Sequence, residues 1–174
     1  IICIKSTIHP SAIDSFLNES SSFSERIVFN PEFLKEGTAI YDFFNPDRII
    51  VGSENSSNSK KIALLYEQIS KEIIFTDPIS SQLIKYLSNS YLPMRLSFAN
   101  EATRLVEYSN ANLQDVLKGV GLDSRIGLHY FRPSPSWGGS CFPKDLIEVN
   151  NFYNKNELNL PLISNIIESN DEHL

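Results

Sequence analysis

The chain has little cysteine, little histidine and no metal-ligand pattern, and each scarcity excludes a class of protein. Its 174 residues include two cysteines, Cys3 and Cys141, which stand far apart in different contexts and form no disulfide framework. That usage indicates a reducing compartment, and we expect a cytoplasmic protein. The three isolated histidines, His9, His129 and His173, lack the spacing of metal ligands, so we expect no metal.

Charge and hydropathy exclude two further classes. A net charge of -6 argues against the basic surface that nucleic-acid binding needs. No apolar run approaches the roughly 20 residues of a membrane-spanning helix. We therefore expect no nucleic-acid partner and no membrane association. The 41% hydrophobic and 21% charged content is ordinary for a soluble globular chain.

The sequence also lacks Gly-x-Gly-x-x-Gly, the turn that holds the phosphates of a dinucleotide. The pair Gly119 and Gly121 leads into a predicted helix end and indicates a C-cap instead. The chain opens on the strand-forming segment 1–5, with no initiator methionine and no leader pattern. We expect a sheet that lacks its first βαβ units, and a chain that is incomplete at both ends.

The first third of the chain alternates strand and helix signals. Apolar runs predict strands at 1–5, 26–29, 48–51 and 73–75, the first of them buried. A helix is predicted from Pro10 to Leu17, followed by a polar loop at 20–24. A loop and helix start at 53–59 leads into helical spacing from Ile62 to Ile69. Strands separated by helix-length segments indicate an α/β sheet, largely parallel.

After Asp77 and Pro78 the pattern becomes helical. Apolar residues keep a helical period to about Asn110, and a helix of about 30 residues spans about 45 Å. That is too long for one layer of a small domain, so we expect it to bridge domains or to pair with a partner subunit in a homodimer or higher homo-oligomer. Further helices are predicted at 112–119, 143–153 and from 160 to the end. We therefore divide the chain into an α/β domain, 1–77, and an all-α domain, 78–174.

The segment Gly138-Gly-Ser-Cys-Phe-Pro-Lys-Asp145 presents a cysteine where a thiolate would be stabilised. Two glycines allow a tight turn, and Pro143 suits the first position of a helix. Cys141 would then lie just before a helix N-terminus, where the helix dipole and Lys144 both favour the nucleophilic anion. On composition alone, an ordinary loop cysteine is the commoner explanation.

Three other segments carry polar residues that chemistry could use. Lys5-Ser-Thr-Ile8 places hydroxyls at the carboxyl end of a strand, where open α/β sheets bind ligands, although a helix cap explains them equally well. Glu32 and Glu36 follow the next strand and could act as a general base and a ligand contact, or be solvated acids of a first helical turn. Lys85 and Asn89 share one face of the long predicted helix.

Together these segments resemble the UDP-glucose/GDP-mannose dehydrogenase family. The matching stretches follow the family's order through nearly the whole chain: 5–7, 30–39, 45–52, 85–89, 123–127 and 138–145. The resemblance implies the C-terminal part of a Rossmann-like NAD-binding domain followed by a helical central dimerisation domain. Two positions depart from the family pattern. His9 precedes Pro10 where the family usually has a proline directly, and Pro93 replaces a small apolar residue and would kink the helix beside Asn89, at a cost of ~3 kcal/mol.

The resemblance also implies an activity, the NAD-dependent four-electron oxidation of the C6 alcohol of a nucleotide sugar. UDP-glucose is the first substrate expected, with GDP-mannose or a UDP-N-acetyl sugar as alternatives. A cysteine would attack the aldehyde to give a thiohemiacetal and then a thioester, an ammonium and an amide would stabilise the oxyanion, and a carboxylate would activate water. These roles fall on Cys141, on Lys85 and Asn89, and on Glu32 assisted by Thr7 and Asp145.

The implied contacts extend to both ligands. Those for the UDP-sugar are Glu32, Phe33, Leu34, Lys35, Glu36, Lys85, Asn89, Arg125, Arg132, Trp137 and Gly138, and Arg125 resembles an arginine that reaches into a neighbouring subunit's site. Those for NAD are Ser6, Thr7, Glu36, Cys141 and Lys144. Two other classes stay open: a non-catalytic helical dimerisation module, and a cysteine hydrolase, for which no acid-His-Cys order stands out near His129.

Overall fold

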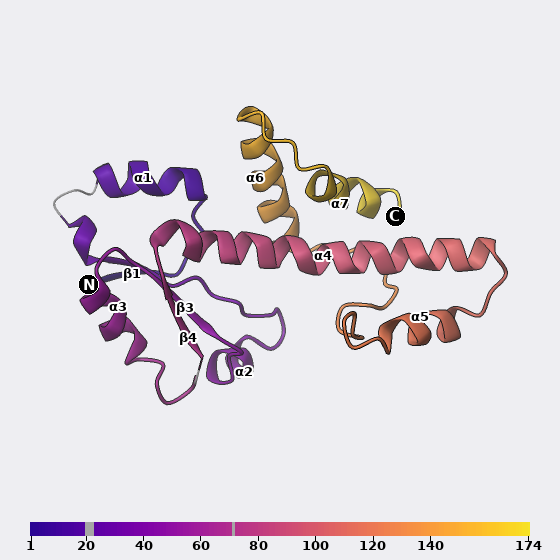
Figure 1. The fold of residues 1–174 in the computed structure, drawn as a ribbon, viewed down its shortest axis with the longest axis horizontal. Coiled ribbons are helices and arrows are strands. Elements are labelled where there is room, and N and C mark those ends of the chain that lie inside the picture. Colours follow the sequence, from indigo (N-terminus) through magenta and orange to yellow (C-terminus); the bar gives the residue numbers. More distant parts are fainter. Residues whose placement is uncertain (20–22, 71) are drawn as a thin grey trace. The chain divides into compact units, whose positions relative to one another are not determined.

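The structure, a computed structural model, describes residues 1–19, 23–70 and 72–174 (Figure 1). Two compact units, 1–85 and 86–174, divide between Lys85 and Tyr86, inside the long helix α4 (Pro78–Tyr108). Most of the polar loop predicted at 20–24 lies outside the described residues. Across the described ranges, no helix is both long and apolar enough to cross a membrane.

The first unit is a four-stranded sheet with short helices. Its strands are β1 (Ile2–Ile4), β2 (Ile27–Phe29), β3 (Ile49–Gly52) and β4 (Ile73–Thr76), in the order β1-β2-β3-β4. The helices of this unit before α4 are α1 (Pro10–Glu19), the 3-10 turn η1 (Ser24–Arg26), α2 (Ala39–Phe44) and α3 (Ser56–Ala63). The predicted α/β class is confirmed.

The sheet is not parallel throughout. The pairs β1–β2 and β3–β4 are parallel, whereas β2 and β3 run antiparallel with Phe29 opposite Gly52. A parallel connection needs a crossover that returns the chain to the starting edge. Between β2 and β3 the chain forms the six-residue α2 and returns antiparallel to β2 without a crossover.

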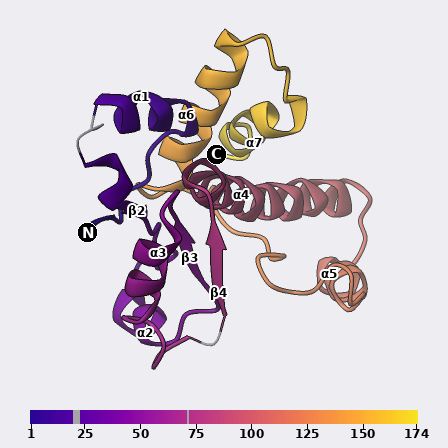
Figure 2. The ribbon, with the colours of Figure 1, turned by 60° about the vertical axis from the view of Figure 1, so that its left-hand side comes forward.

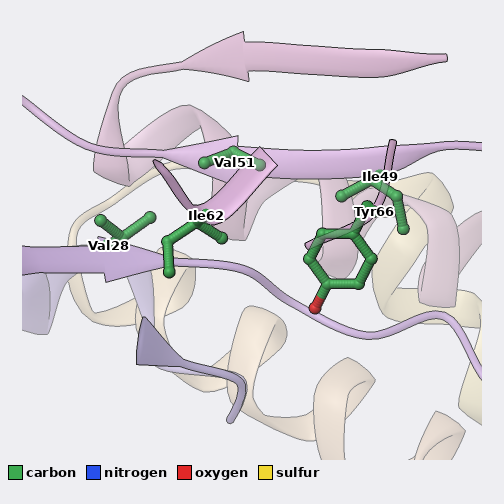
Figure 3. Close-up of a cluster of buried hydrophobic side chains, with 5 residues drawn as sticks. All are labelled: Val28, Ile49, Val51, Ile62 and Tyr66. Carbon is green, nitrogen blue, oxygen red and sulfur yellow. The ribbon is translucent and has the colours of Figure 1, made fainter. Parts of the chain in front are cut away.

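The side chains of β2 alternate between the two faces of the sheet, as the pleat requires. Ile27 and Phe29 pack against α1, in a cluster with Ile13, whereas Val28 packs on the other face. The second cluster joins Val28 to Ile49, Val51, Ile62 and Tyr66 (Figure 3). α1 and α3 therefore cover opposite faces, and β2 is buried along its whole length.

Two local predictions for this unit are wrong. The first strand is not buried: Ile2 is 41% exposed, because β1 lies at an edge of the sheet with β2 as its neighbour. The helix expected to reach Ile69 ends at Ala63, and the chain continues in turns closed by bonds three residues apart, such as Leu65 N–H to Ile62 O. Leu65 is consequently exposed.

The long helix begins where Asp77 and Pro78 predicted. Asp77 Oδ1 accepts from the Ser80 N–H at 2.8 Å, a helix N-cap, and the helix continues through Pro93 to Tyr108. Its first turn lies close to β3. A Cβ on Gly52 would stand 2.4 Å from Ser81 Oγ and 2.8 Å from Asp77 O, so glycine is required for this approach.

The second unit is helical, as predicted. The later part of α4 is joined by α5 (Leu113–Gly121), α6 (Phe142–Lys155) and α7 (Pro161–Asp171). α6 and α7 lie on one side of α4 and α5 on the other (Figures 1 and 2). Its core joins Trp137, Leu146 and Ile166 to Met94, Leu96, Phe142, Ile163 and Ile167.

The pair Gly119 and Gly121 is not a C-cap. Both residues lie within the last turn of α5, which ends at Gly121 rather than at Gly119. A Cβ on Gly121 would stand 2.3 Å from Leu128 Cδ2, so this glycine allows the following loop to pack closely against the helix. In that loop, Gly127 and Tyr130 both have positive φ, at +72° and +56°.

Candidate functional site

Cys141 caps the N-terminus of α6. Its carbonyl accepts from the Asp145 N–H at 3.0 Å, the first bond of the helix, and its thiol is exposed. α6 starts at Phe142, so Pro143 occupies the second helical position and not the first, and its missing N–H is again not needed there. Gly139 has φ +85° and lets the loop turn into the helix. The predicted location of the thiol is confirmed.

Asp145, in the first turn of α6 after this thiol, is buried and held by two other side chains. It is 1% exposed, and Asn89 Nδ2 donates to its Oδ2 at 2.6 Å. Lys144 Nζ donates to its Oδ1 at 2.5 Å. Burial opposes protonation of Lys144, but the hydrogen bond and charge of Asp145 outweigh it and raise the pKa of the ammonium. Lys144, which the sequence placed near the thiol, is thus paired to Asp145.

A second bond between α4 and α6 was not predicted. The buried hydroxyl of Tyr86 donates to Glu148 Oε2. Burial, then the hydrogen bond and charge of Glu148 and the charge of Asp145, raise the pKa of Tyr86 well above its ordinary value. The spacing Asp145 to Glu148, three apart on a helix, was the only sequence signal for this contact.

Trp137 lies in the core and holds the start of the loop that leads to Cys141. Its indole N–H donates to Ser97 Oγ at 2.8 Å, and its backbone exchanges two bonds with the Asn170 side chain. Its ring packs edge-on against Phe142, with ring centroids 6.3 Å apart. The indole expected to contact substrate therefore anchors the loop, while Gly138 is exposed.

In the first unit, two of the predicted site residues, Lys85 and Glu32, form a pair. Lys85 is 4% exposed, and its Nζ donates to Glu32 O at 2.6 Å and to Glu32 Oε1 at 3.2 Å. The same Nζ stands 5.2 Å from the ring centre of Phe33, on whose ring Arg48 also lies, at 3.9 Å. The ammonium thus fixes the loop that follows β2.

The rest of the loop from Glu32 to Glu36 is not a first helical turn. Leu34 N–H donates to Glu32 Oε2 at 2.6 Å, and α2 begins only at Ala39. Lys35 pairs with Asp42 at 3.2 Å. Burial opposes ionisation of Asp42, but bonds from Lys35 and Thr38 outweigh it and lower the pKa of the carboxyl. Leu34, Lys35 and Glu36 are exposed.

Ser6 and Thr7 follow the carboxyl end of β1, as predicted. The next residue is held from α4, because Ile8 N–H donates to Gln82 Oε1 at 2.9 Å. Sequence reasoning did not find the cluster beside them, in which Tyr66 Oη donates to Asn30 Oδ1 at 2.6 Å and Lys5 Nζ donates to the same oxygen at 2.9 Å. Asn30 then donates to Ile50 O and ties the two antiparallel strands together.

The two arginines predicted as site residues, Arg125 and Arg132, do not join the residues around Cys141. Arg125 pairs with Asp123 at 2.6 Å within one exposed turn, where its hydrogen bonds lower the pKa of Asp123. Arg132 is exposed beside buried Phe131. The structure therefore groups Cys141, Lys144, Asp145 and Asn89 in the second unit and Glu32, Phe33 and Lys85 in the first. Both arginines lie at the surface, where a ligand or another chain can reach them.

Sequence comparison identifies two family domains along the chain. The NAD binding domain of the UDP-glucose/GDP-mannose dehydrogenase family matches residues 1–70, and the central domain of the same family matches residues 79–172. Together the two matches account for nearly the whole sequence.

Individual relatives agree. UDP-glucose 6-dehydrogenase of Rickettsia felis is 38% identical over 99% of this chain, and that of Rhizobium meliloti is 34% identical over 98%. The solved UDP-glucose dehydrogenase of Pyrobaculum islandicum superposes with a TM-score of 0.89 at 32% identity, covering 98% of this chain and 40% of that one. A solved UDP-D-ManNAc dehydrogenase of Pyrococcus horikoshii shares the fold, with a TM-score of 0.83 at 19% identity. That match covers 99% of this chain and 42% of the other. The chain spans about 40% of the length of the curated relatives it matches.

Proposed function

Because this chain belongs to the UDP-glucose/GDP-mannose dehydrogenase family, we propose that it serves a dehydrogenase that oxidises the C6 alcohol of UDP-glucose to the carboxylate of UDP-glucuronate. The observation that carries the proposal is the exposed thiol of Cys141 at the N-terminus of α6, followed by an Asp145 carboxylate that Asn89 and Lys144 hold in place.

Cys141 is the nucleophile of the proposed reaction. The aldehyde formed from the alcohol is attacked by the thiolate to give a thiohemiacetal, which is oxidised to a thioester. The covalent bond keeps the aldehyde from escaping and divides a four-electron oxidation into two steps. The helix N-terminus favours the anionic sulfur that this attack requires.

Lys85 and Asn89 stabilise the oxyanion. They stand one turn apart on α4, and an ammonium and an amide are both hydrogen-bond donors. Each donor of this kind is worth ~3 kcal/mol in the transition state. Their existing bonds to Glu32 and Asp145 hold both side chains in place before substrate binds.

Glu32 activates the water that hydrolyses the thioester, assisted by Thr7 and Asp145. A carboxylate can act as a general base when a water lies within hydrogen-bond reach. The loop from Glu32 to Glu36, the loop from Arg132 to Gly138 and Arg125 bind the sugar nucleotide. Arg125 suits phosphate or carboxylate because its guanidinium is planar and always charged.

When bound, NAD would supply the hydride acceptor that both oxidations need. Ser6 and Thr7 fit its nicotinamide end, since they are polar and stand at the carboxyl end of a parallel strand, where open α/β sheets bind ligands. Glu36, Cys141 and Lys144 complete the contacts that this chain offers. Without the glycine-rich turn, the 174-residue chain alone binds NAD weakly.

UDP-glucose is preferred over other sugar nucleotides because the relatives with 34–38% identity over almost the whole chain are named UDP-glucose 6-dehydrogenases. The solved relatives named for UDP-D-ManNAc and GDP-mannose are 19% and 23% identical and support the fold only. The long helix α4 suits a homodimer, with exposed apolar side chains such as Phe98 and Leu105 along it.

The test uses this chain's residues joined to the further segments that its relatives carry. Cys141→Ser should abolish UDP-glucuronate formation, whereas the matched variant Cys3→Ser should retain it. Wild-type production of the acid by Cys141→Ser would remove the proposed nucleophile. Comparing turnover of UDP-glucose with that of GDP-mannose and a UDP-N-acetyl sugar tests the substrate, since faster turnover of either rival would refute the assignment.

A further inference from the structure

Two hydrogen bonds join α4 to α6 in the second unit. Asn89 donates to Asp145, and Tyr86 donates to Glu148. The donors are three residues apart on α4 and the acceptors three apart on α6, so each pair occupies one face of its helix. The proposed chemistry uses the first bond and gives the second no role.

Lys144 connects the second bond to the nucleophile. Its Nζ is paired with Asp145 Oδ1, and the carboxylate of Glu148 and the sulfur of Cys141 both contribute to the raised pKa of the ammonium after Asp145. Glu148 and Cys141 are therefore within electrostatic reach of the same cation. A change in the hydrogen bonding of Glu148 should therefore change the reactivity of the Cys141 thiol.

We propose that Tyr86 and Glu148 are positioning residues for Cys141. The tyrosine hydroxyl holds the Glu148 carboxylate against α4, so that this carboxylate does not compete with Asp145 and the Cys141 thiolate for the Lys144 ammonium. Tyr86 is 1% exposed, so its hydroxyl has little competing water. A tyrosine hydroxyl is protonated, and so can donate, at neutral pH. The inference rests on the proposed role of Cys141, but its main consequence is a thiol reactivity that can be measured without turnover.

Removing the hydroxyl should redirect Glu148. A partly buried carboxylate that loses a donor is costly. Lys144 and Glu148 are four residues apart on α6 and therefore share a face of the helix, so the Lys144 ammonium is a cation that Glu148 can approach. Glu148 would then compete with Asp145 for Lys144 and bring uncompensated negative charge toward Cys141. Negative charge disfavours the thiolate and slows its reactions.

The experiment measures alkylation of Cys141 by iodoacetamide in the 174-residue chain carrying Cys3→Ser, so that a single thiol remains. Tyr86→Phe should slow the reaction about five-fold, which is the rate ratio that corresponds to the free energy of one lost hydrogen bond. Glu148→Gln removes the charge and should react at least as fast as the parent. The double variant should recover to within about two-fold of the parent, because the competing carboxylate is gone.

The matched controls lie on α4, the helix that carries Tyr86. Tyr108→Phe and Glu107→Gln alter exposed residues near the end of α4 and should leave the alkylation rate unchanged. Fluorescence of Trp137, the single tryptophan, verifies that the second unit is folded in every variant.

The inference fails if folded Tyr86→Phe reacts at the parental rate, or if the double variant stays as slow as Tyr86→Phe, since the tyrosine would then act through packing alone. Should Tyr86→Phe not fold, Glu148→Gln decides the matter, and a rate below that of the parent overturns the inference. In the longer enzyme, Tyr86→Phe should lower kcat and leave KM for the sugar nucleotide unchanged. If the measured alkylation rates match the prediction but the longer enzyme has no dehydrogenase activity, the proposed function is refuted and the positioning role still holds.

Discussion

Lys85 is bonded twice to Glu32, once to the backbone carbonyl at 2.6 Å and once to the carboxylate at 3.2 Å. One ammonium thus fixes both the path of the loop after β2 and the direction of its carboxylate. The two residues are 53 positions apart, so the sequence could suggest each as functional but could not pair them.

Lys85→Met should destabilise the first unit by about 2 kcal/mol, because it leaves a half-buried carboxylate and a carbonyl without their donor. Lys60→Met, at an exposed position of α3, is the matched control and should change stability by less than about 0.5 kcal/mol. Urea unfolding followed by far-UV circular dichroism measures the difference, with Trp137 fluorescence reporting the second unit separately. Equal stability of the two variants would contradict the structural role of the pair.

Gly52→Ala should destabilise the first unit by about 2 kcal/mol through overpacking. The new Cβ would meet Ser81 Cβ at 2.5 Å and Asp77 O at 2.8 Å, and neither belongs to the end of a flexible side chain. Gly119→Ala is the control, since no atom lies within 4 Å of the place where its new methyl group would stand, and a helical alanine should stabilise by about 0.5–1 kcal/mol. The same urea series compares them, and opposite signs are expected.

The stabilisation that Asp77 gives the first unit should be lost in acid. Bonds from Ser80 lower the pKa of Asp77 below 3.8, so the folded state binds this proton less readily than the unfolded state. The stabilisation is complete above 3.8 and is lost as pH falls through the lower folded value. Asp77→Asn should cost about 0.5 kcal/mol at neutral pH, and the deficit should vanish in strong acid. A deficit for Asp77→Asn that stays constant with pH would refute the linkage.

Asn170→Ala should destabilise the second unit by about 2 kcal/mol. It removes two bonds to the Trp137 backbone, at 2.8 Å and 3.0 Å, and leaves a buried N–H and carbonyl unpaired. Asn165→Ala, exposed on the same helix, should be close to neutral or slightly stabilising. Urea unfolding monitored by Trp137 fluorescence reads this unit directly. A neutral Asn170→Ala would mean that the loop before Cys141 is anchored by other contacts.

Local sequence determined the elements and the chemistry of single positions. Short apolar runs predicted β2 and β3, and the change to a helical pattern after Asp77 and Pro78 predicted the start of α4. The location of Cys141 before a helix followed from glycines on one side and Pro143 on the other. All of these depend on residues within a few positions of one another, where steric and capping preferences act.

Only the tertiary structure decided which of these elements and side chains meet. The antiparallel β2–β3 pair, the exposure of β1 and the early end of α3 depend on strand order and on packing across the sheet. Asn89 and Asp145 are 56 positions apart, and Tyr86 and Glu148 are 62 apart. Contacts at such separations depend on how the chain folds back on itself, and local propensity carries no information about that path.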